Sequence, residues 1–492
     1  MPIAKTLIIQ RHPAGKGGVI LSSRGGLASQ RHGRGVEHRR ERLDLCALRG
    51  EEIGLTRALV GGLAMEFLKE NWPRVRTRFA MLVLLGLVLF APAAALAQTS
   101  LKIFTGGLLR PDLFRQIGEA YARANPEVSV EVETGGATPE LQQRALATAI
   151  SSKDATLDLV LIDVLRPPQW GAGQVIEPLD AFLGAERDAT VARYLAPYRA
   201  TMSVGGKVVA LPISADVQML YFRKDLLEKH GLSAPKTWDE LKSSAQKVLE
   251  VEKTPALRGF EMSGAPVEAT VCSYLTGLWG AGEEMTRSGK LTLDGEGAKK
   301  PFQLWGDMKT AKLLATNPAE VSTDRVRQDL QAGTLLFGSA WAYAFPRLQS
   351  DAGTLVKDKI GLARLPGFSP DHQVGCIGGW QVAVTAFSKN KPEAVKFARF
   401  LSSPETAKLL ALQAGWLPVF EPLYADEEVL KAQPWFRDAL PALQAGKLRP
   451  ATPRYGEVSE IIRTNVSAFL AGTKNADAAL TDMTKRLGVI FK

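Results

Sequence analysis

The chain has 492 residues, 46% of them hydrophobic, which suffices for one or two globular domains. Its net charge of +10 is concentrated in residues 1–97, which hold 15 basic and 7 acidic side chains. The other 395 residues (492 less 97) carry 46 basic and 44 acidic side chains, a net charge of +2. This ordinary surface excludes the electrostatic argument for nucleic-acid binding, so we expect no nucleic-acid partner.

The N-terminal part has the pattern of an export signal. Residues 1–64 are rich in Gly and Arg without an apolar period, and are either over-extended translation or a disordered basic arm. Residues 65–97 have the pattern of a signal peptide, because three arginines precede an apolar run ending in a small-x-small site. The alternative is one membrane-spanning helix. We expect cleavage after Ala97 and a soluble periplasmic protein, not lipid-anchored because residue 98 is Gln98 rather than Cys.

Hydrophobic spacing predicts alternating strands and helices at the start of the mature chain. The expected elements are strands over 101–104, 128–132 and 157–162, and helices over 112–124 and 141–151. This rhythm predicts an α/β domain with a largely parallel sheet, in which ligands bind beyond the carboxyl ends of strands. Further on, a capping box at Thr237 opens a helix to about Val251. Ser403 opens another helix, which Gly415 can end.

Motifs of catalysis and metal binding are missing from the mature chain. It has no Gly-x-Ser-x-Gly elbow, phosphate-binding loop or His-Glu-x-x-His motif, and His230 and His372 are isolated. We therefore expect no metal, no other cofactor and no catalytic residue, although a carboxylate pair could be assembled from distant positions. Cys272 and Cys376 allow either a disulfide, which export would permit, or two buried free thiols.

Five segments stand in a recognisable order along the mature chain. They cover residues 206–212, 220–241, 330–341, 378–380 and 388–418. Together they resemble the type 1 extracellular solute-binding proteins of ATP-driven (ABC) sugar importers, the group that includes maltose- and trehalose-binding proteins. The resemblance covers the mature chain nearly end to end.

The resemblance implies an α/β, two-lobe periplasmic binding-protein fold of the type II kind, with a ligand cleft between lobes and a hinge. The first lobe would comprise 98–214 plus 376–425, and the second 216–375 plus 426–492. The implied function is capture of a sugar, a disaccharide or oligosaccharide, and its delivery to the membrane permease subunits of an ABC importer. The protein would then be a monomer and not an enzyme.

The resemblance also implies a binding site made of aromatic rings and charged groups. The matching residues are Asp163, Asp216, Trp341, Tyr343, Gly379, Trp380 and Arg449. Trp341, Tyr343 and Trp380 would stack on the apolar face of a sugar, because flat rings match the C–H faces of a pyranose. The two aspartates and the arginine would form charge-assisted hydrogen bonds with the hydroxyls. We expect Trp279 and Trp416 in the core.

Each of these positions has a plainer explanation. A tryptophan can serve core packing, Asp163 can cap a helix or turn, Asp216 can pair with an arginine at the hinge, and Arg449 can lie on the surface. The segment Leu108-Leu109-Arg110 also departs from the family, which often carries a polar or acidic contact there. The alternatives are an exported enzyme acting on saccharides, or a binding protein for a polyol phosphate or other anion held by Arg110 and Arg449.

Overall fold

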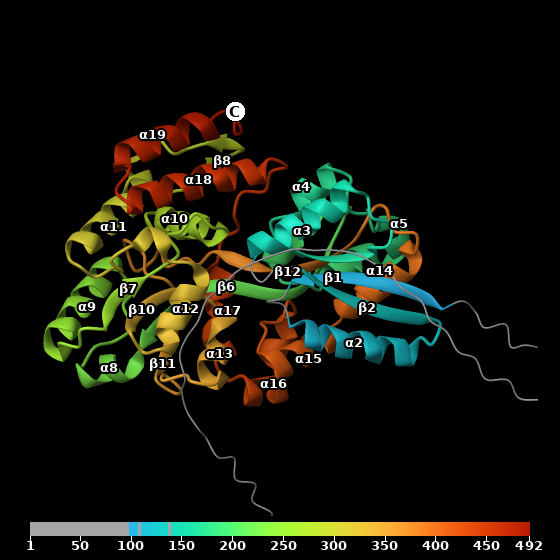
Figure 1. The fold of residues 1–492 in the computed structure, drawn as a ribbon, viewed down its shortest axis with the longest axis horizontal. Coiled ribbons are helices and arrows are strands. Elements are labelled where there is room, and N and C mark those ends of the chain that lie inside the picture. The colour runs from blue at the N-terminus through green and yellow to red at the C-terminus, as the bar shows by residue number, and fades with distance from the viewer. Residues whose placement is uncertain (1–97, 107–109, 136–138) are drawn as a thin grey trace, which may run out of the picture. The chain divides into compact units, whose positions relative to one another are not determined.

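The computed structural model describes residues 98–106, 110–135 and 139–492, shown as coloured ribbon in Figure 1. The predicted extension over 1–64 and signal peptide over 65–97 lie outside the described residues. Among the described residues, no helix is both long and apolar enough to cross a membrane.

Twelve strands are present in the described part of the chain. They are β1 (Thr99–Gly106), β2 (Val128–Gly135), β3 (Leu159–Asp163), β4 (Ser203–Val204), β5 (Lys207–Val208), β6 (Leu211–Arg223), β7 (Arg258–Glu261), β8 (Thr286–Arg287), β9 (Lys290–Leu291), β10 (Leu335–Trp341), β11 (Ile360–Ala363) and β12 (Ile377–Val384).

Helices make up most of the rest of the described chain. The α-helices are α2 (Pro111–Ala124), α3 (Pro139–Ser151), α4 (Pro167–Ala172), α5 (Asp180–Leu183), α6 (Arg187–Ala192), α7 (Ala196–Thr201), α8 (Lys224–Lys229), α9 (Trp238–Glu252), α10 (Glu268–Gly280), α11 (Lys300–Thr310), α12 (Thr323–Gln331), α13 (Ala344–Ser350), α14 (Lys391–Leu401), α15 (Pro404–Ala414), α16 (Glu427–Ala432), α17 (Phe436–Ala445), α18 (Tyr455–Leu470) and α19 (Ala476–Leu487). Short 3₁₀ helices are η1 (Gly184–Glu186), η2 (Glu296–Ala298), η3 (Pro318–Glu320) and η4 (Glu421–Tyr424).

The first three strands follow the pattern predicted from the sequence. β1 pairs in parallel with β2 and with β3, and helices α2 and α3 form the crossovers. The apolar stripe of α2 is buried, with Leu113, Phe114 and Ile117 at most 2% exposed. The expected capping box is also present, since Glu240 N donates to the Thr237 hydroxyl over 3.2 Å. α15 ends at Gly415, whose φ of 64° suits glycine.

The prediction of a largely parallel sheet is wrong beyond these strands. The main sheet runs β2-β1-β3-β12-β6-β10-β7, and β12 lies antiparallel to both β3 and β6. β10 and β11 also pair antiparallel with β6, whereas β10 and β7 are parallel. The β-α-β rhythm holds only for the N-terminal segment, because β12 returns to the sheet from a distant part of the chain.

One long strand joins the two parts of the sheet. β6 pairs with β12 over residues 211–217 and with β10 over residues 218–222 (Figure 1, where β6 is green and β12 orange). The ends of β3 and β10 and the middle of β6 and β12 therefore lie close together. Polar and aromatic side chains placed at these points by register face a common space.

A disulfide fixes α10 to the start of β12. Cys272 and Cys376 are both fully buried and bonded, with their Cα atoms 5.6 Å apart. Of the two possibilities that the sequence left open, the structure has the bridge. Helix α10 is buried all round over residues 269–280, as expected for a helix that is apolar on every face.

Candidate functional site

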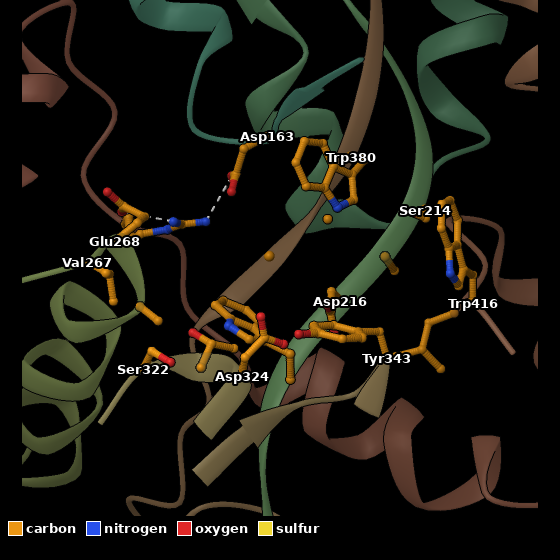
Figure 2. A pocket seen from close by; sticks show the side chains of 18 residues that line it. Asp163, Ser214, Asp216, Val267, Glu268, Ser322, Asp324, Tyr343, Trp380 and Trp416 are labelled. Atoms are coloured by element: carbon orange, nitrogen blue, oxygen red, sulfur yellow. Dashed lines mark hydrogen bonds and ion pairs between the residues drawn. The ribbon is translucent and has the colours of Figure 1, made fainter. Parts of the chain in front are cut away.

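A cavity of about 250 Å³ lies where the strand ends meet. Its walls come from the ends of β3 and β10, the middle of β6 and β12, the N-termini of α10 and α12, and the segments around residues 416 and 449. Figure 2 shows Asp163 and Trp380 on one side of this space and Ser322 and Asp324 on the opposite side.

All seven residues singled out from the sequence line this cavity. They are Asp163, Asp216, Trp341, Tyr343, Gly379, Trp380 and Arg449. They lie on five separate segments of the chain, so only the fold brings them together. Their individual roles toward a ligand stay predictions.

A buried arginine connects two acids at one edge of the cavity. Arg449 Nη2 lies 3.0 Å from Asp163 Oδ1, and Arg449 Nη1 lies 3.0 Å from Glu268 Oε1 (dashed lines in Figure 2). Glu268 also accepts hydrogen bonds from the Tyr455 and Ser459 hydroxyls. The Arg449 side chain is only 2% exposed, so the alternative of a surface arginine is wrong.

The charges in this network stabilise one another. Burial raises the pKa of Asp163, and the neighbouring Arg449 guanidinium works in the opposite direction. Burial alone would lower the pKa of Arg449, but the Asp163 and Glu268 carboxylates raise it above its ordinary value. The guanidinium therefore stays charged. Asp163 Oδ1 also accepts from the Leu165 backbone N–H over 3.2 Å, the turn contact that the sequence allowed.

Asp216 is a carboxyl group in a different environment. It sits in the middle of β6, opposite Gly378 of β12. Burial raises its pKa to about 7, although backbone N–H groups, such as that of Val217 at 2.9 Å, favour the charged form. No arginine of the described residues forms an ion pair with Asp216, so the predicted alternative of a hinge ion pair is not what the structure shows.

Trp341 lies against backbone that only glycine leaves open. A Cβ atom on Gly378 would lie 2.5 Å from the Trp341 ring. Any residue larger than glycine at position 378 would therefore displace this ring. The Arg449 guanidinium lies 6.0 Å from the centre of the same ring, on the edge of cation–π range. The backbone carbonyl of Trp341 accepts from the buried Tyr221 hydroxyl over 2.8 Å, which fixes the end of β10.

Gly379 places Trp380 at the cavity. Its φ of 129° is favourable only for glycine, and a Cβ there would lie 2.4 Å from the Ser214 carbonyl oxygen. The pairing of β12 with β6 shifts register between Trp380 and Gln381. This local irregularity leaves the Trp380 ring half-buried beside Asp163, its partner on β3.

Several lining residues were not predicted from the sequence. They are Ser214, Ala215, Val267, Glu268, Ala269, Ser322, Thr323, Asp324, Gly378, Trp416 and Leu417. The expectation that Trp416 belongs to the core is only partly confirmed, because the half-buried ring packs against the core at Phe114 and also lines the cavity. Trp279, by contrast, is 3% exposed and lies in the core as predicted. The Gly-Trp-Leu-Pro segment at 415–418 was the available signal for Trp416.

The acidic lining residues had no such signal. Glu268 and Asp324 are ordinary first-turn acids of α10 and α12, and a helix N-terminus commonly carries an acid for its dipole. Only the fold shows that both helices point at the cavity. Asp324 Oδ1 is buried and forms an ion pair with Arg327, whose Nε lies 3.6 Å away.

Arg110 does not take the place that the anion alternative gave it. It bonds to Asp112, with Nη2 2.7 Å from the carboxylate, and it does not line the cavity. Within the described residues, no cluster of three His, Cys, Asp or Glu side chains could hold a metal ion.

Comparison with known proteins identifies the class of this fold and site. A sequence profile of bacterial extracellular solute-binding proteins matches residues 109–408. The chain belongs to this family of ABC-importer binding proteins. The family is one of binding proteins rather than enzymes, and its description places its members outside the cytoplasmic membrane.

Individual relatives agree with this assignment. A probable ABC transporter-binding protein of Deinococcus radiodurans is 33% identical over 353 residues, 69% of this chain and 81% of the relative. The mannitol-binding protein of Pseudomonas aeruginosa is 27% identical over 69% of this chain and 81% of the relative. The maltose-bound structure of T. maritima MalE3 superposes with a TM-score of 0.73 at 27% identity, covering 80% and 100% of the chains. The predicted two-lobe α/β fold is confirmed.

Proposed function

We propose that the cavity binds one or two rings of a sugar or a polyol of similar size. The observation that carries this proposal is the convergence of Trp341, Tyr343, Trp380 and Trp416 with several carboxylates on one small space. Rings provide flat apolar contact, and carboxylates accept strongly from hydroxyls. The relatives that bind maltose and mannitol support this ligand class. A volume near the lower end of the usual ~300–1,000 Å³ favours a compact ligand.

The two sides of the cavity would belong to two lobes that close on the ligand. We assign 98–214 plus 376–425 to the first lobe and 216–375 plus 426–492 to the second. The change of β6 from β12 to β10 between Val217 and Gln218 supports a hinge at this point. Closure of a hinge around a ligand is an established switch, and the closed form would be the one that the permease subunits recognise.

The protein would act as an exported monomer in the periplasm, cut free after Ala97. Mass measurement of the exported product tests this step, since a retained segment 65–97 would contradict it. Binding is tested by calorimetry and thermal melts of that product with maltose, trehalose, glucose and mannitol. A ligand at a hundredfold excess over its Kd adds about 2.7 kcal/mol to stability. No response to these four or to any acidic sugar would contradict the proposed ligand class.

Catalysis on a saccharide is the competing function. Burial raises the pKa of Asp216 to about 7, which would suit a general acid. The Asp163 and Glu268 carboxylates are already bonded to Arg449, which fits anchoring better than proton transfer. We therefore expect no hydrolysis of maltose or trehalose. Hydrolysis that disappears in Asp216→Asn would show an enzyme instead.

A further inference from the structure

A second cavity adjoins the first. It has a volume of about 360 Å³ and shares Asp163, Glu268 and Trp380 with the first cavity. Trp380 therefore borders both spaces.

Three arginines line the second cavity. Arg144 lies on α3, Arg166 directly before α4, and Arg463 on α18. Within the described residues none of the three forms an ion pair. Two of them bond to neutral groups: Arg166 donates to Gln169 Oε1 over 3.0 Å, and Arg463 donates to the Pro266 carbonyl over 3.3 Å.

The two acidic side chains shared by both cavities already form ion pairs. Asp163 and Glu268 bind Arg449, and Glu268 also accepts from two hydroxyls. The three arginines that line this cavity outnumber its two carboxylates, and both carboxylates are also bound by Arg449 outside it. Concave surfaces of one sign, with low-dielectric walls such as the buried Trp170 and Leu161, focus the field on a bound ion.

Two residues that line this cavity also have buried hydrogen-bond donors without partners. The Gln142 side chain is 5% exposed, and its amide nitrogen has no hydrogen-bond partner. The Nε of Arg463 is likewise buried without a partner. Leaving such donors unpaired is costly, so the lining of this cavity has more donors than its own acceptors satisfy.

We infer that the natural ligand carries an anionic group, a carboxylate or a phosphate on a sugar, that passes Trp380 and is bound by Arg144, Arg166 and Arg463. The inference rests on the proposed function, since the sugar itself occupies the first cavity. A guanidinium group can bind two oxygens of a carboxylate or phosphate at once through two parallel N–H donors. Three arginines around one cavity therefore suit an anionic group, whereas a neutral hydroxyl would need only one.

Calorimetry with matched ligands tests this inference. The pairs are glucose with glucuronate, galactose with galacturonate, and glucose with glucose 6-phosphate, with inorganic phosphate alone as a further probe. We expect the acidic member of at least one pair to bind about ten- to a hundredfold more tightly than its neutral member. Whether the uronate or the phosphate gains more identifies the anionic group.

Arginine variants connect the effect to this cavity. Arg166→Gln and Arg463→Gln should each remove about tenfold or more of the acidic ligand's advantage while leaving neutral-sugar affinity within about twofold. Arg437→Gln, an exposed arginine of α17 outside both cavities, is the matched control and should change neither. Melting curves of all three variants establish that they are folded.

The outcomes separate this inference from the proposed function. Neutral sugars that bind as tightly as their acidic partners would overturn the anionic site and leave sugar binding intact. Inorganic phosphate that binds as tightly as glucose 6-phosphate would also overturn it, because the site would then take a free anion. Failure of every sugar, neutral or acidic, would overturn the proposed function itself.

Discussion

At the scale of single residues, the site combines a tryptophan ring that packs beside a glycine with a buried network of charged side chains. Gly378 leaves room that a side chain would fill, and the Trp341 ring uses that room to border the cavity. A side chain at Gly378 would displace the Trp341 ring, whereas one at Gly379 would meet the Ser214 carbonyl and disturb the pairing of β12 with β6. The two tryptophans are therefore expected to act on binding more than on folding.

Replacing either tryptophan with alanine tests this expectation. Trp341→Ala and Trp380→Ala should each weaken sugar binding by about 1–3 kcal/mol, the usual loss for an aromatic anchor. The phenylalanine variants at the same positions keep a flat ring and should recover much of the affinity. Calorimetry gives the affinity and circular dichroism the fold. Two unfolded alanine variants would assign these rings to the core instead.

The raised pKa of Asp216 predicts pH dependence. A sugar hydroxyl donates best to an ionised carboxylate, so affinity should rise with pH as Asp216 ionises around 7. Stability should change in the opposite direction. Because the folded pKa exceeds the unfolded one, this group's contribution is complete below about pH 4 and is lost as pH rises through about 7.

Asp216→Asn separates this effect from other titrations. The variant should bind sugar with a flatter pH profile between 5 and 8 and unfold with a smaller pH slope. Asp188→Asn, an exposed carboxylate on α6 that lines neither cavity, serves as the control. Equal pH slopes in the parent protein and Asp216→Asn would show that another group is responsible.

Arg449 is expected to matter first for stability. Arg449→Ala leaves Asp163 and Glu268 as two close carboxylates without their cation, and breaking a buried pair costs about 3–5 kcal/mol. Arg454→Ala removes an exposed arginine paired with Glu457, and such a solvent-screened surface pair should contribute much less than the buried one. Urea unfolding measures both. Equal losses in the two variants would mean that the buried network adds no stability.

At the scale of helices and strands, the sequence predicted correctly those features that depend on residues close together in the chain. The stripe of α2, the capping box at Thr237 and the ending of α15 at Gly415 depend on residues within a few positions, and all are present. The antiparallel place of β12 between β3 and β6 depends on contacts between distant segments. The hydrophobic periodicity of each segment does not indicate which distant strand it pairs with.

The disulfide is an element-scale bond, because it connects α10 to β12 across 104 residues of chain. Closing a loop of about 100 residues stabilises by up to about 4.7 kcal/mol in the chain-entropy account. Cys272→Ala with Cys376→Ala should therefore lower the free energy of unfolding by about 2–5 kcal/mol. Melts with and without reductant check this, since reductant should shift the parent but not the double variant.

At the scale of the whole molecule, ordered motifs predicted the family and the fold, and comparison confirms both. Six of the seven site residues could be named in advance because each stands in or beside a motif segment or at a strand end, and Arg449 was named from the resemblance alone. Glu268, Asp324 and the three arginines of the second cavity could not, because their local surroundings are those of ordinary helix residues. Only the meeting of distant helices distinguishes them.

The last prediction concerns closure of the two lobes. If the cavity lies between lobes that close on a sugar, ligand binding should lower the radius of gyration measured by small-angle X-ray scattering. The Trp341→Ala variant, at sugar concentrations that leave it unbound, should keep the ligand-free value. At saturating sugar it should also become compact, because its hinge is unchanged. A radius that stays constant at saturating sugar, despite binding in the calorimeter, would mean that the ligand enters a preformed site without hinge motion.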